Sequence, residues 1–211
     1  MSQLLIIRHG ETAWNRERVF RGRTDVPLSE RGVAQAGLLA GELKEARIEA
    51  IHSSPLSRAI RTAEPLASLL HLDVVADQRL TDMSFGDWEG RPEAEVKQAE
   101  PDALGAWHER PHEFRPPGGE SLSEVATRAW DAVDEIAREH PSGRVALFSH
   151  RVVCKVIVLT ALGAGLDAFW HLRLDTASIS VIERAGRSWT ATLVNDTHHL
   201  HSLPYAAAVD F

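Results

Sequence analysis

Two histidines closely follow the ends of apolar runs, at places where a histidine can do chemistry. His9 follows the run at residues 4–7, and His150 follows the run at residues 145–148. In open α/β sheets the ligand crevice lies beyond the carboxyl ends of the strands, so these two side chains are expected to meet at one sheet edge. A neutral imidazole has one unprotonated nitrogen that can attack an electrophile or accept a proton. The ordinary alternative for each of the 11 histidines is a hydrogen-bonded structural role.

Arg58 adds a positive charge near a predicted helix start. Ser54 and Pro55 form the usual N-terminal pattern of a capping serine and a proline at the first helical position. A cation there is disfavoured by roughly 0.3–1 kcal/mol, unless an anion binds at the helix N-terminus. Arg61 adds a second charge one turn later. On its own, the pattern fits a solvated surface arginine better than an anion site.

The elements that must position these residues read as an α/β protein, because apolar runs alternate with helix-like segments. Helices are predicted from Ser29, from Ser54, from the capping box at Ser121 to about His140, and after His150. Buried strands are predicted at residues 4–7, 48–51, 74–75, 145–148, 179–182 and 190–194, in a mixed sheet. Spacing alone leaves the strand order open.

The segment from residue 85 to 119 breaks this regularity. Six prolines and glycines fall between residues 86 and 111, and the segment carries Trp88, Trp107 and Phe114. We interpret it as a partly helical insertion over the sheet, more lid than core.

Composition excludes several classes of protein. The chain has 211 residues and a formal charge of -7, from 23 Lys and Arg against 30 Asp and Glu, which disfavours nucleic-acid binding and anionic membranes. The single cysteine, Cys154, excludes an internal disulfide framework and a cysteine-rich zinc module. The N-terminus lacks a signal-peptide pattern, and no apolar stretch is long enough to span a bilayer. We therefore predict a soluble, cytoplasmic protein.

Taken together, the motifs resemble those of the histidine phosphatase superfamily, which includes the phosphoglycerate mutases. The matching segments are Arg-His-Gly-Glu-Thr at 8–12 with Trp14 and Asn15, then residues 28–32, 53–59, 85–90, 117–121, 149–150 and 195–197. They occur in order over nearly the whole chain, which makes the resemblance specific. It implies one domain over residues 1–211: a three-layer α/β/α sandwich with a mostly parallel mixed sheet and a lid insertion at approximately 85–120.

The resemblance also implies a mechanism. His9 would attack phosphorus and form a phosphohistidine, with its pKa lowered by nearby cations. Arg8 and Arg58 would supply that charge and forked donors to the phosphoryl oxygens. His150, if protonated, would add charge opposite the nucleophile, and Asn15 would donate a further hydrogen bond. Such transfer needs mainly positioning and electrostatic stabilisation, and the family uses neither a metal nor another cofactor.

The general acid is where this chain departs from the family. The family has a glutamate where this chain has Asp82, one methylene shorter, in the sequence Leu-Thr-Asp at 80–82. Asp82 would protonate the leaving oxygen directly or through a water, with Glu11 and Glu89 as alternative acids.

Further arginines surround the expected phosphate position. Arg21 and Arg23 flank Gly22 in the loop that closes over phosphate in the family, and we favour Arg21 and Gly22 as substrate contacts. Arg151 replaces the glycine that usually follows the second histidine. It would contact a second anionic group of the substrate or lie on the surface at a helix start, and the sequence does not separate the two. Lys155 stands where relatives often have arginine.

Two other features are given structural interpretations. His198, His199 and His201 have metal-like spacing, but only Asp196 lies near them as an acidic partner, so we assign no metal site. Cys154 lies in an apolar helix and is expected to be buried.

The choice of reaction depends on the insertion. Dedicated mutases of the family have a longer insertion rich in tyrosine and lysine, whereas this chain has one tyrosine, Tyr205, and one lysine, Lys97, in the insertion. We therefore predict a hydrolase for a small-molecule phosphomonoester. The alternatives are a cofactor-dependent phosphoglycerate mutase and a catalytically impaired phospholigand-binding protein. The resemblance implies a homodimer, since relatives are often dimers, while the sequence itself leaves the oligomeric state open.

Overall fold

A six-stranded mixed sheet forms the centre of the molecule. The computed structural model describes residues 1–204. The strands are β1 (Ser2–Arg8), β2 (Ala50–Ser53), β3 (Val74–Ala76), β4 (Arg144–Ser149), β5 (Ile179–Ala185) and β6 (Ser188–Asp196), in the order β3-β2-β4-β1-β5-β6. Strands β1 to β4 run parallel to one another, β5 runs antiparallel to β1, and β6 runs antiparallel to β5. The predicted mixed, mostly parallel sheet is confirmed, although β2 begins two residues later than predicted.

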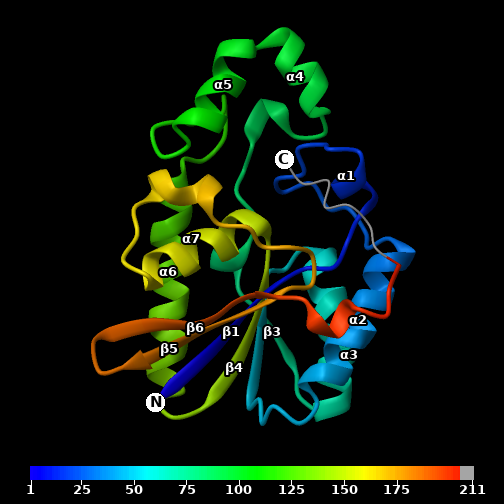
Figure 1. Cartoon of the computed structure of the whole chain (residues 1–211), viewed down its shortest axis with the longest axis vertical. Coiled ribbons are helices and arrows are strands. Elements are labelled where there is room, and N and C mark those ends of the chain that lie inside the picture. Colours follow the sequence, from blue (N-terminus) through cyan, green and yellow to red (C-terminus); the bar gives the residue numbers. More distant parts are fainter. Residues whose placement is uncertain (205–211) are drawn as a thin grey trace.

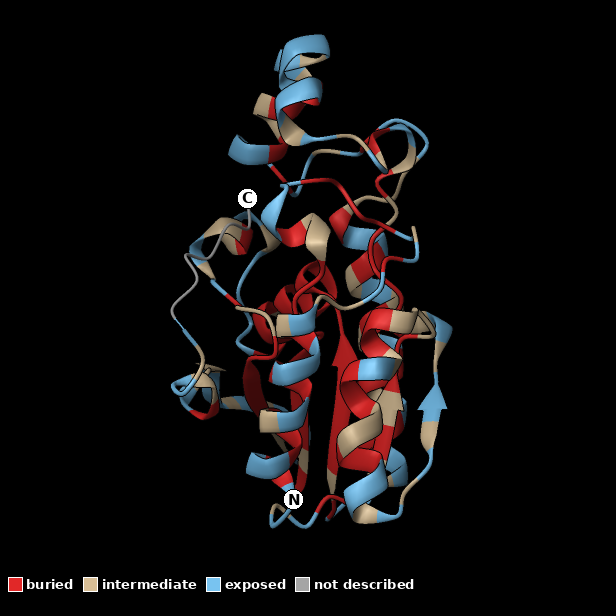
Figure 2. Ribbon diagram, turned by 90° about the vertical axis from the view of Figure 1, so that its right-hand side faces the viewer, coloured by how far each residue is buried: buried red, intermediate tan, exposed pale blue. Residues whose placement is uncertain are grey.

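Helices cover both faces of the sheet, because successive residues of a strand point to opposite faces. In β1, Leu4 and Ile6 belong to the core on the side of α6 (Leu122–Glu139) and α7 (Arg151–Ala161). Leu5 and Ile7 belong to the core under α2 (Glu30–Leu43) and α3 (Ser57–Leu70). Figures 1 and 2 show the resulting three layers, with a buried sheet between helices whose outer faces are exposed.

Helix starts follow the predicted capping residues in two of three cases. The Ser29 hydroxyl accepts from the Gly32 amide at 3.1 Å, and Ser121 forms the expected capping box with Glu124. The prediction that Ser54 caps the second of the predicted helices is wrong. That helix, α3, begins at Ser57 with Leu56 as an N-cap that makes no side-chain bond. The Ser54 hydroxyl instead bonds to His150.

The insertion extends from the carboxyl edge of the sheet (Figure 1). It contains a 3-10 turn at Gly86–Trp88 and the helices α4 (Glu93–Ala99) and α5 (Pro101–Glu109). Trp88 and Trp107 are fully buried and belong to the same core as β1 and α7. The root of the insertion is therefore core, which corrects the expectation that the whole segment is more lid than core.

Short elements complete the described chain. They are α1 (Ala13–Arg16) and 3-10 turns at Gln78–Leu80, Leu166–His171 and His198–Leu200. Within residues 1–204, no helix is long and apolar enough to cross a membrane.

Candidate active site

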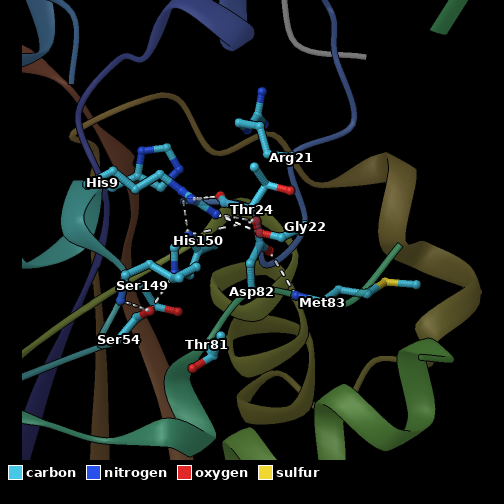
Figure 3. A network of polar contacts seen from close by, with 12 residues as sticks. His9, Arg21, Gly22, Thr24, Ser54, Thr81, Asp82, Met83, Ser149 and His150 are labelled. Carbon is cyan, nitrogen blue, oxygen red and sulfur yellow. Dashed lines mark hydrogen bonds and ion pairs between the residues drawn. The ribbon is translucent and has the colours of Figure 1, made fainter. Parts of the chain in front are cut away.

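The register of two parallel strands brings His9 and His150 together. Arg8 pairs with Ser149 at the carboxyl ends of β1 and β4, so the next residue of each strand is a histidine. The His9 amide donates to the Ser149 carbonyl at 2.9 Å, and the two imidazole centres lie 5.2 Å apart. Figure 3 shows the two rings side by side, with Asp82 and the loop of Arg21, Gly22 and Thr24 nearby. The predicted meeting of the two histidines is confirmed.

His9 presents one bare ring nitrogen. Its Nδ1 lies 2.6 Å from the Gly10 carbonyl oxygen, which can only accept, so Nδ1 carries the proton. Its Nε2 is buried and has no hydrogen-bond partner among residues 1–204. Burial lowers the pKa of His9 well below 6.5, and the charges of Arg58, Arg8 and Arg21 lower it further. Burial thus lowers the pKa of His9 more than the nearby cations do, whereas the sequence pointed to the cations alone. His9 Nε2 therefore holds a free lone pair at neutral pH.

Arg58 is a fully buried organiser of the site. Its Nε donates to His150 Nδ1 at 3.1 Å, and Nη1 donates to the Thr24 carbonyl at 2.9 Å. Nη2 donates to the Gly22 carbonyl at 2.8 Å and to Asp82 Oδ2 at 3.3 Å. Most of its N–H donors are therefore engaged with the second histidine, the acid and the loop. The alternative of a solvated surface arginine is excluded.

Arg61 behaves differently from Arg58. It is exposed and pairs with Glu64 at 2.9 Å on the outer face of α3. We expected Arg61 to add a second positive charge on the face of Arg58. The Arg61 side chain lies in solvent instead, so it adds no charge inside the site.

His150 is neutral, in the opposite tautomer to His9. Because its Nδ1 accepts from Arg58, Nε2 must carry the proton, and it donates to Ser54 Oγ at 2.7 Å. Burial, with Arg58 next in size, lowers the pKa of His150 well below 6.5. The expectation that a protonated His150 adds positive charge opposite the nucleophile is therefore not met in this arrangement. His150 contributes hydrogen bonds instead of a full charge.

Asp82 lies beside both Arg58 and His150. Its Oδ2 is 3.3 Å from Arg58 Nη2 and 3.7 Å from His150 Nδ1, while Oδ1 accepts from the Met83 amide at 3.0 Å. Burial raises the pKa of Asp82 above its ordinary 3.8 and outweighs Arg58, the nearest charge that lowers it. The shift is toward the protonated carboxyl group, which is the form that a general acid needs.

A backbone clamp holds the shorter acid in place. Arg128 of α6 donates to the carbonyl oxygens of Thr81 at 2.7 Å and Asp82 at 3.1 Å. The Ser149 hydroxyl donates to the Leu80 carbonyl at 2.7 Å. The end of β4 and helix α6 therefore both position the backbone from which Asp82 projects.

The two alternative acids are engaged elsewhere. Glu11 Oε1 accepts from the Ser29 hydroxyl at 2.7 Å, at the start of α2. Glu89 Oε1 accepts from the Phe85 amide at 3.0 Å, at the root of the insertion. Neither carboxylate makes a hydrogen bond to His9 or His150 among the described residues, whereas Asp82 lies next to His150.

The remaining predicted phosphate contacts are Arg8, Asn15 and Arg21. Arg8 is buried, and its Nη1 donates to the Leu174 carbonyl at 2.7 Å. Asn15 Oδ1 accepts from the Thr12 amide and hydroxyl at 2.8 and 2.9 Å, which orients its NH₂ group. Arg21 is also buried, and its charge acts on His9, His150 and Asp82.

A cavity opens on the Asp82 side of these groups. It is partly open to solvent and is lined by Val19, Phe20, Arg21, Gly22, Asp82, Phe85, Arg151 and Val152. Gly22 has φ +52°, and a side chain there would collide with Glu89, so this loop position requires glycine. Arg23 lies outside the cavity, exposed and paired with Glu120 at 3.0 Å.

Besides Arg128, sequence reasoning missed the roles of two residues that hold the site. Thr62 Oγ1 accepts from the Gly10 amide at 2.9 Å and donates to the Arg58 carbonyl at 2.7 Å, which links α3 to the end of β1. Its spacing four residues after Arg58 placed it on the same helix face, a signal that could have been used. Ser54 was interpreted as a helix cap, because a serine before proline has that meaning in most sequences.

The next residues are Cys154 and Lys155 of α7 and the histidines that follow β6. Cys154 is buried, as predicted, and burial raises the pKa of its thiol. Lys155 is buried too, and its Nζ donates to the Phe169 carbonyl at 3.1 Å. The rings of His198 and His201 stack 5.3 Å apart. Within residues 1–204, no group of three or more His, Cys, Asp or Glu side chains is arranged to hold a metal.

Comparison with known proteins identifies one family that matches most of the chain. A sequence model described as "Histidine phosphatase superfamily (branch 1)" matches residues 4–197. Phosphoserine phosphatase 1 of Hydrogenobacter thermophilus is 36% identical over 200 residues, which cover 95% of each chain.

Solved structures give the same result. Bacillus stearothermophilus YhfR aligns with a TM-score of 0.91 and 32% identity, covering 95% of this chain and all of the other. A mycobacterial glucosyl-3-phosphoglycerate phosphatase in complex with VO3 aligns with a TM-score of 0.86 and 30% identity, covering 92% of this chain and 99% of the other.

Proposed function

This chain belongs to the histidine phosphatase superfamily (branch 1), and from that premise we propose that it hydrolyses small phosphomonoesters through a phosphohistidine at His9. The observation that carries the proposal is the bare, buried Nε2 of His9, with the charges of Arg8, Arg21 and Arg58 acting on it. A neutral nucleophile among cations suits attack on a phosphoryl dianion.

The first step transfers the phosphoryl group to the enzyme. The lone pair of His9 Nε2 forms a bond to phosphorus while the bond between phosphorus and the ester oxygen breaks. The proton of Asp82 passes to that oxygen, so the leaving group departs as a neutral alcohol. Arg8, Arg21 and the NH₂ group of Asn15 would bind the phosphoryl oxygens, where charge is spread in the transition state.

The second step returns the enzyme to its starting state. The Asp82 carboxylate takes a proton from a water, whose oxygen attacks phosphorus as the bond to Nε2 breaks. Inorganic phosphate leaves, His9 regains its lone pair, and Asp82 is protonated again. In both steps the role of Arg58 and His150 is to hold Asp82 and the loop with Gly22 in position.

The positive charge in this scheme comes from arginine side chains, so we propose that the reaction needs neither a metal ion nor another cofactor. We propose four further properties of the protein, which concern its domain, its insertion, its oligomeric state and its location. The chain would act as one domain over residues 1–211, with the segment at approximately 85–120 closing over the site. The protein would be a homodimer and would act in the cytoplasm. Light scattering of the purified protein tests the dimer.

A phosphoglycerate mutase would use the same phosphohistidine and differ only in the acceptor. The insertion here is short, with two helices of 7 and 9 residues. That favours water as the acceptor, on the reasoning that mutases of the family have a longer insertion.

Phosphate release from a panel of phosphomonoesters, with and without a chelator, tests the proposal. We expect hydrolysis that the chelator leaves unchanged. Interconversion of phosphoglycerates that depends on a bisphosphoglycerate primer and exceeds hydrolysis would instead establish a mutase. Binding across the panel without turnover would establish an impaired phospholigand-binding protein.

A further inference from the structure

The cavity beside Asp82 contains a guanidinium group that the phosphoryl group does not require. Arg21 and Arg151 both line the cavity, and Asp82 is the one acidic residue among its lining residues. Arg21 acts electrostatically on His9, together with Arg8 and Arg58. Three arginines thus surround the point of attack, and Arg151 is a further arginine on the cavity wall that includes Asp82.

Arg151 lies on the side of the acid, since it lines the cavity together with Asp82, and His9 is not among the lining residues. It is among the charges that lower the pKa of Asp82. A general acid must touch the oxygen that it protonates, so the leaving group has to occupy the space next to Asp82. Because the cavity is that space, Arg151 faces the leaving group.

Arg151 is also held in a buried and electrostatically unfavourable position. It is the first residue of α7, where the helix dipole is positive, and only 6% of it is exposed. Its guanidinium carbon lies 5.5 Å from the centre of the Trp170 ring, a cation–π distance. Trp170 is anchored in turn, since its Nε1 donates to the Trp107 carbonyl at 2.9 Å. This excludes the interpretation of Arg151 as a solvated surface residue.

We propose that Arg151 binds a carboxylate on the leaving group, which makes the substrates phosphomonoesters of small hydroxy acids. This inference rests on the proposed phosphatase function. A carboxylate matches the planar guanidinium fork with two parallel hydrogen bonds. The walls of the cavity include the apolar side chains of Phe20, Phe85 and Val152, which suit the carbon atoms of such a leaving group.

The test compares substrates that differ in the carboxylate. The ratio of kcat/KM for 3-phosphoglycerate to that for glycerol 3-phosphate is expected to exceed tenfold in the wild-type protein. In R151Q we expect that ratio to fall at least tenfold, mainly through KM for the carboxylated substrate. A ratio of two rates is independent of the folded fraction, so partial unfolding of the variant does not affect it.

R110Q is the matched control, because Arg110 is an exposed arginine on the insertion, 3.6 Å from Glu113. It removes the same charge from the protein and is expected to keep the wild-type ratio. The proposal would be overturned if R151Q lowered kcat/KM for both substrates in equal proportion. It would also be overturned if the ratio of the two kcat/KM values stayed within about threefold of the wild-type ratio.

A binding experiment separates this inference from the proposed function. In a His9→Ala background, calorimetry compares the affinity for O-phosphoserine with that for O-phosphoethanolamine, with and without R151Q. A preference for phosphoserine that R151Q abolishes supports the carboxylate site even if the wild-type protein hydrolyses nothing. Equal affinities in the parent protein contradict it even if hydrolysis is fast.

Discussion

The two central histidines differ in tautomer although both follow parallel strands. The Gly10 carbonyl holds the proton of His9 on Nδ1, whereas the Arg58 guanidinium keeps the proton of His150 on Nε2. Of these two histidines, His9 alone therefore presents a bare Nε2, and the choice of nucleophile between them follows from the hydrogen-bond partners of the two rings. Neither partner can be assigned from the identical residue types at the two strand ends.

Asp82 gives the first prediction at this scale. Asp82→Asn removes the proton donor, so kcat for an alkyl phosphate is expected to fall about 10²–10³-fold. A p-nitrophenolate leaves without a proton, so the loss with p-nitrophenyl phosphate should stay below about tenfold on the same grounds. Steady-state kinetics with the two substrates measure the difference. Equal losses would show that Asp82 is not the acid.

The pH dependence of kcat/KM follows from the same two groups. His9 must be unprotonated, and its pKa lies well below 6.5, so activity is lost only as the pH falls far below that value. Asp82 must be protonated, and its pKa lies above 3.8, so activity is lost as the pH rises through its raised pKa. The profile should therefore fall on the alkaline side in the wild-type protein and lose that limb in Asp82→Asn. An alkaline limb that persists in the variant would assign it to another group.

At the scale of elements, the close approach of α2 to the turn after β1 positions the nucleophile. A side chain at Gly10 would lie 2.7 Å from the Gly32 carbonyl, and one at Gly32 would collide with the Glu11 carbonyl. The turn that carries His9 is thus held against the first turn of α2.

Two glycines of α2 provide a matched prediction. Alanine is favoured over glycine inside a helix by about 1 kcal/mol. Gly37→Ala has no atom within 4 Å of the new side chain and should raise the free energy of unfolding by about that amount. Gly32→Ala should lower the free energy of unfolding and reduce activity, because α2 must move away from Glu11. Urea unfolding measures both, and stabilisation by Gly32→Ala would contradict the close packing.

The sequence predicted the elements better than the contacts between them. Apolar runs located the strands, and Ser29 and Ser121 located two helix starts, because these signals are local. Strand order and the Arg8–Ser149 register depend on pairing between distant segments, so periodicity carries no information about them. The start of α3 was missed because the Ser54 hydroxyl bonds to His150, a residue 96 positions away.

Prediction of the site was uneven for the same reason. The motif placed His9, His150, Arg58 and Asp82 near one another, and the structure brings them together. It could not reveal that Arg58 bonds to the Gly22 and Thr24 carbonyls, or that Arg128 holds the backbone of Asp82. Such contacts involve carbonyl oxygens, which every residue has, so no residue type marks them.

At the scale of the whole molecule, an acidic protein surrounds a basic pocket. The formal charge is -7, yet Arg8, Arg21, Arg58 and Arg151 are all buried at one edge of the sheet. The overall charge disfavours large polyanions, whereas the pocket selects a small anion that can enter it. Burial of these groups also makes folding depend on pH.

Stability is expected to decrease as the pH falls below about 6.5. The pKa values of His9 and His150 are lowered by folding, so the unfolded chain binds more protons below that pH and is favoured. Each histidine contributes up to about 1.4 kcal/mol per pH unit in that window. Asp82, with a raised pKa, acts in the opposite direction above its ordinary 3.8.

His9→Asn isolates one histidine, since it retains Asp82 and His150. The free energy of unfolding, measured by urea titration between pH 7 and pH 5, should fall less steeply in His9→Asn than in the wild-type protein. Parallel pH dependences would mean that His9 is not held neutral by the fold.

The most direct test of the account is to identify the phosphorylated residue during turnover. The protein is mixed with substrate, quenched in alkali to preserve phosphohistidine, and digested for mass spectrometry. We expect one acid-labile phosphoryl group on the peptide that contains His9, and its loss together with hydrolysis in His9→Ala. Turnover that persists in His9→Ala, or a phosphoryl group on another residue, would contradict the central claim.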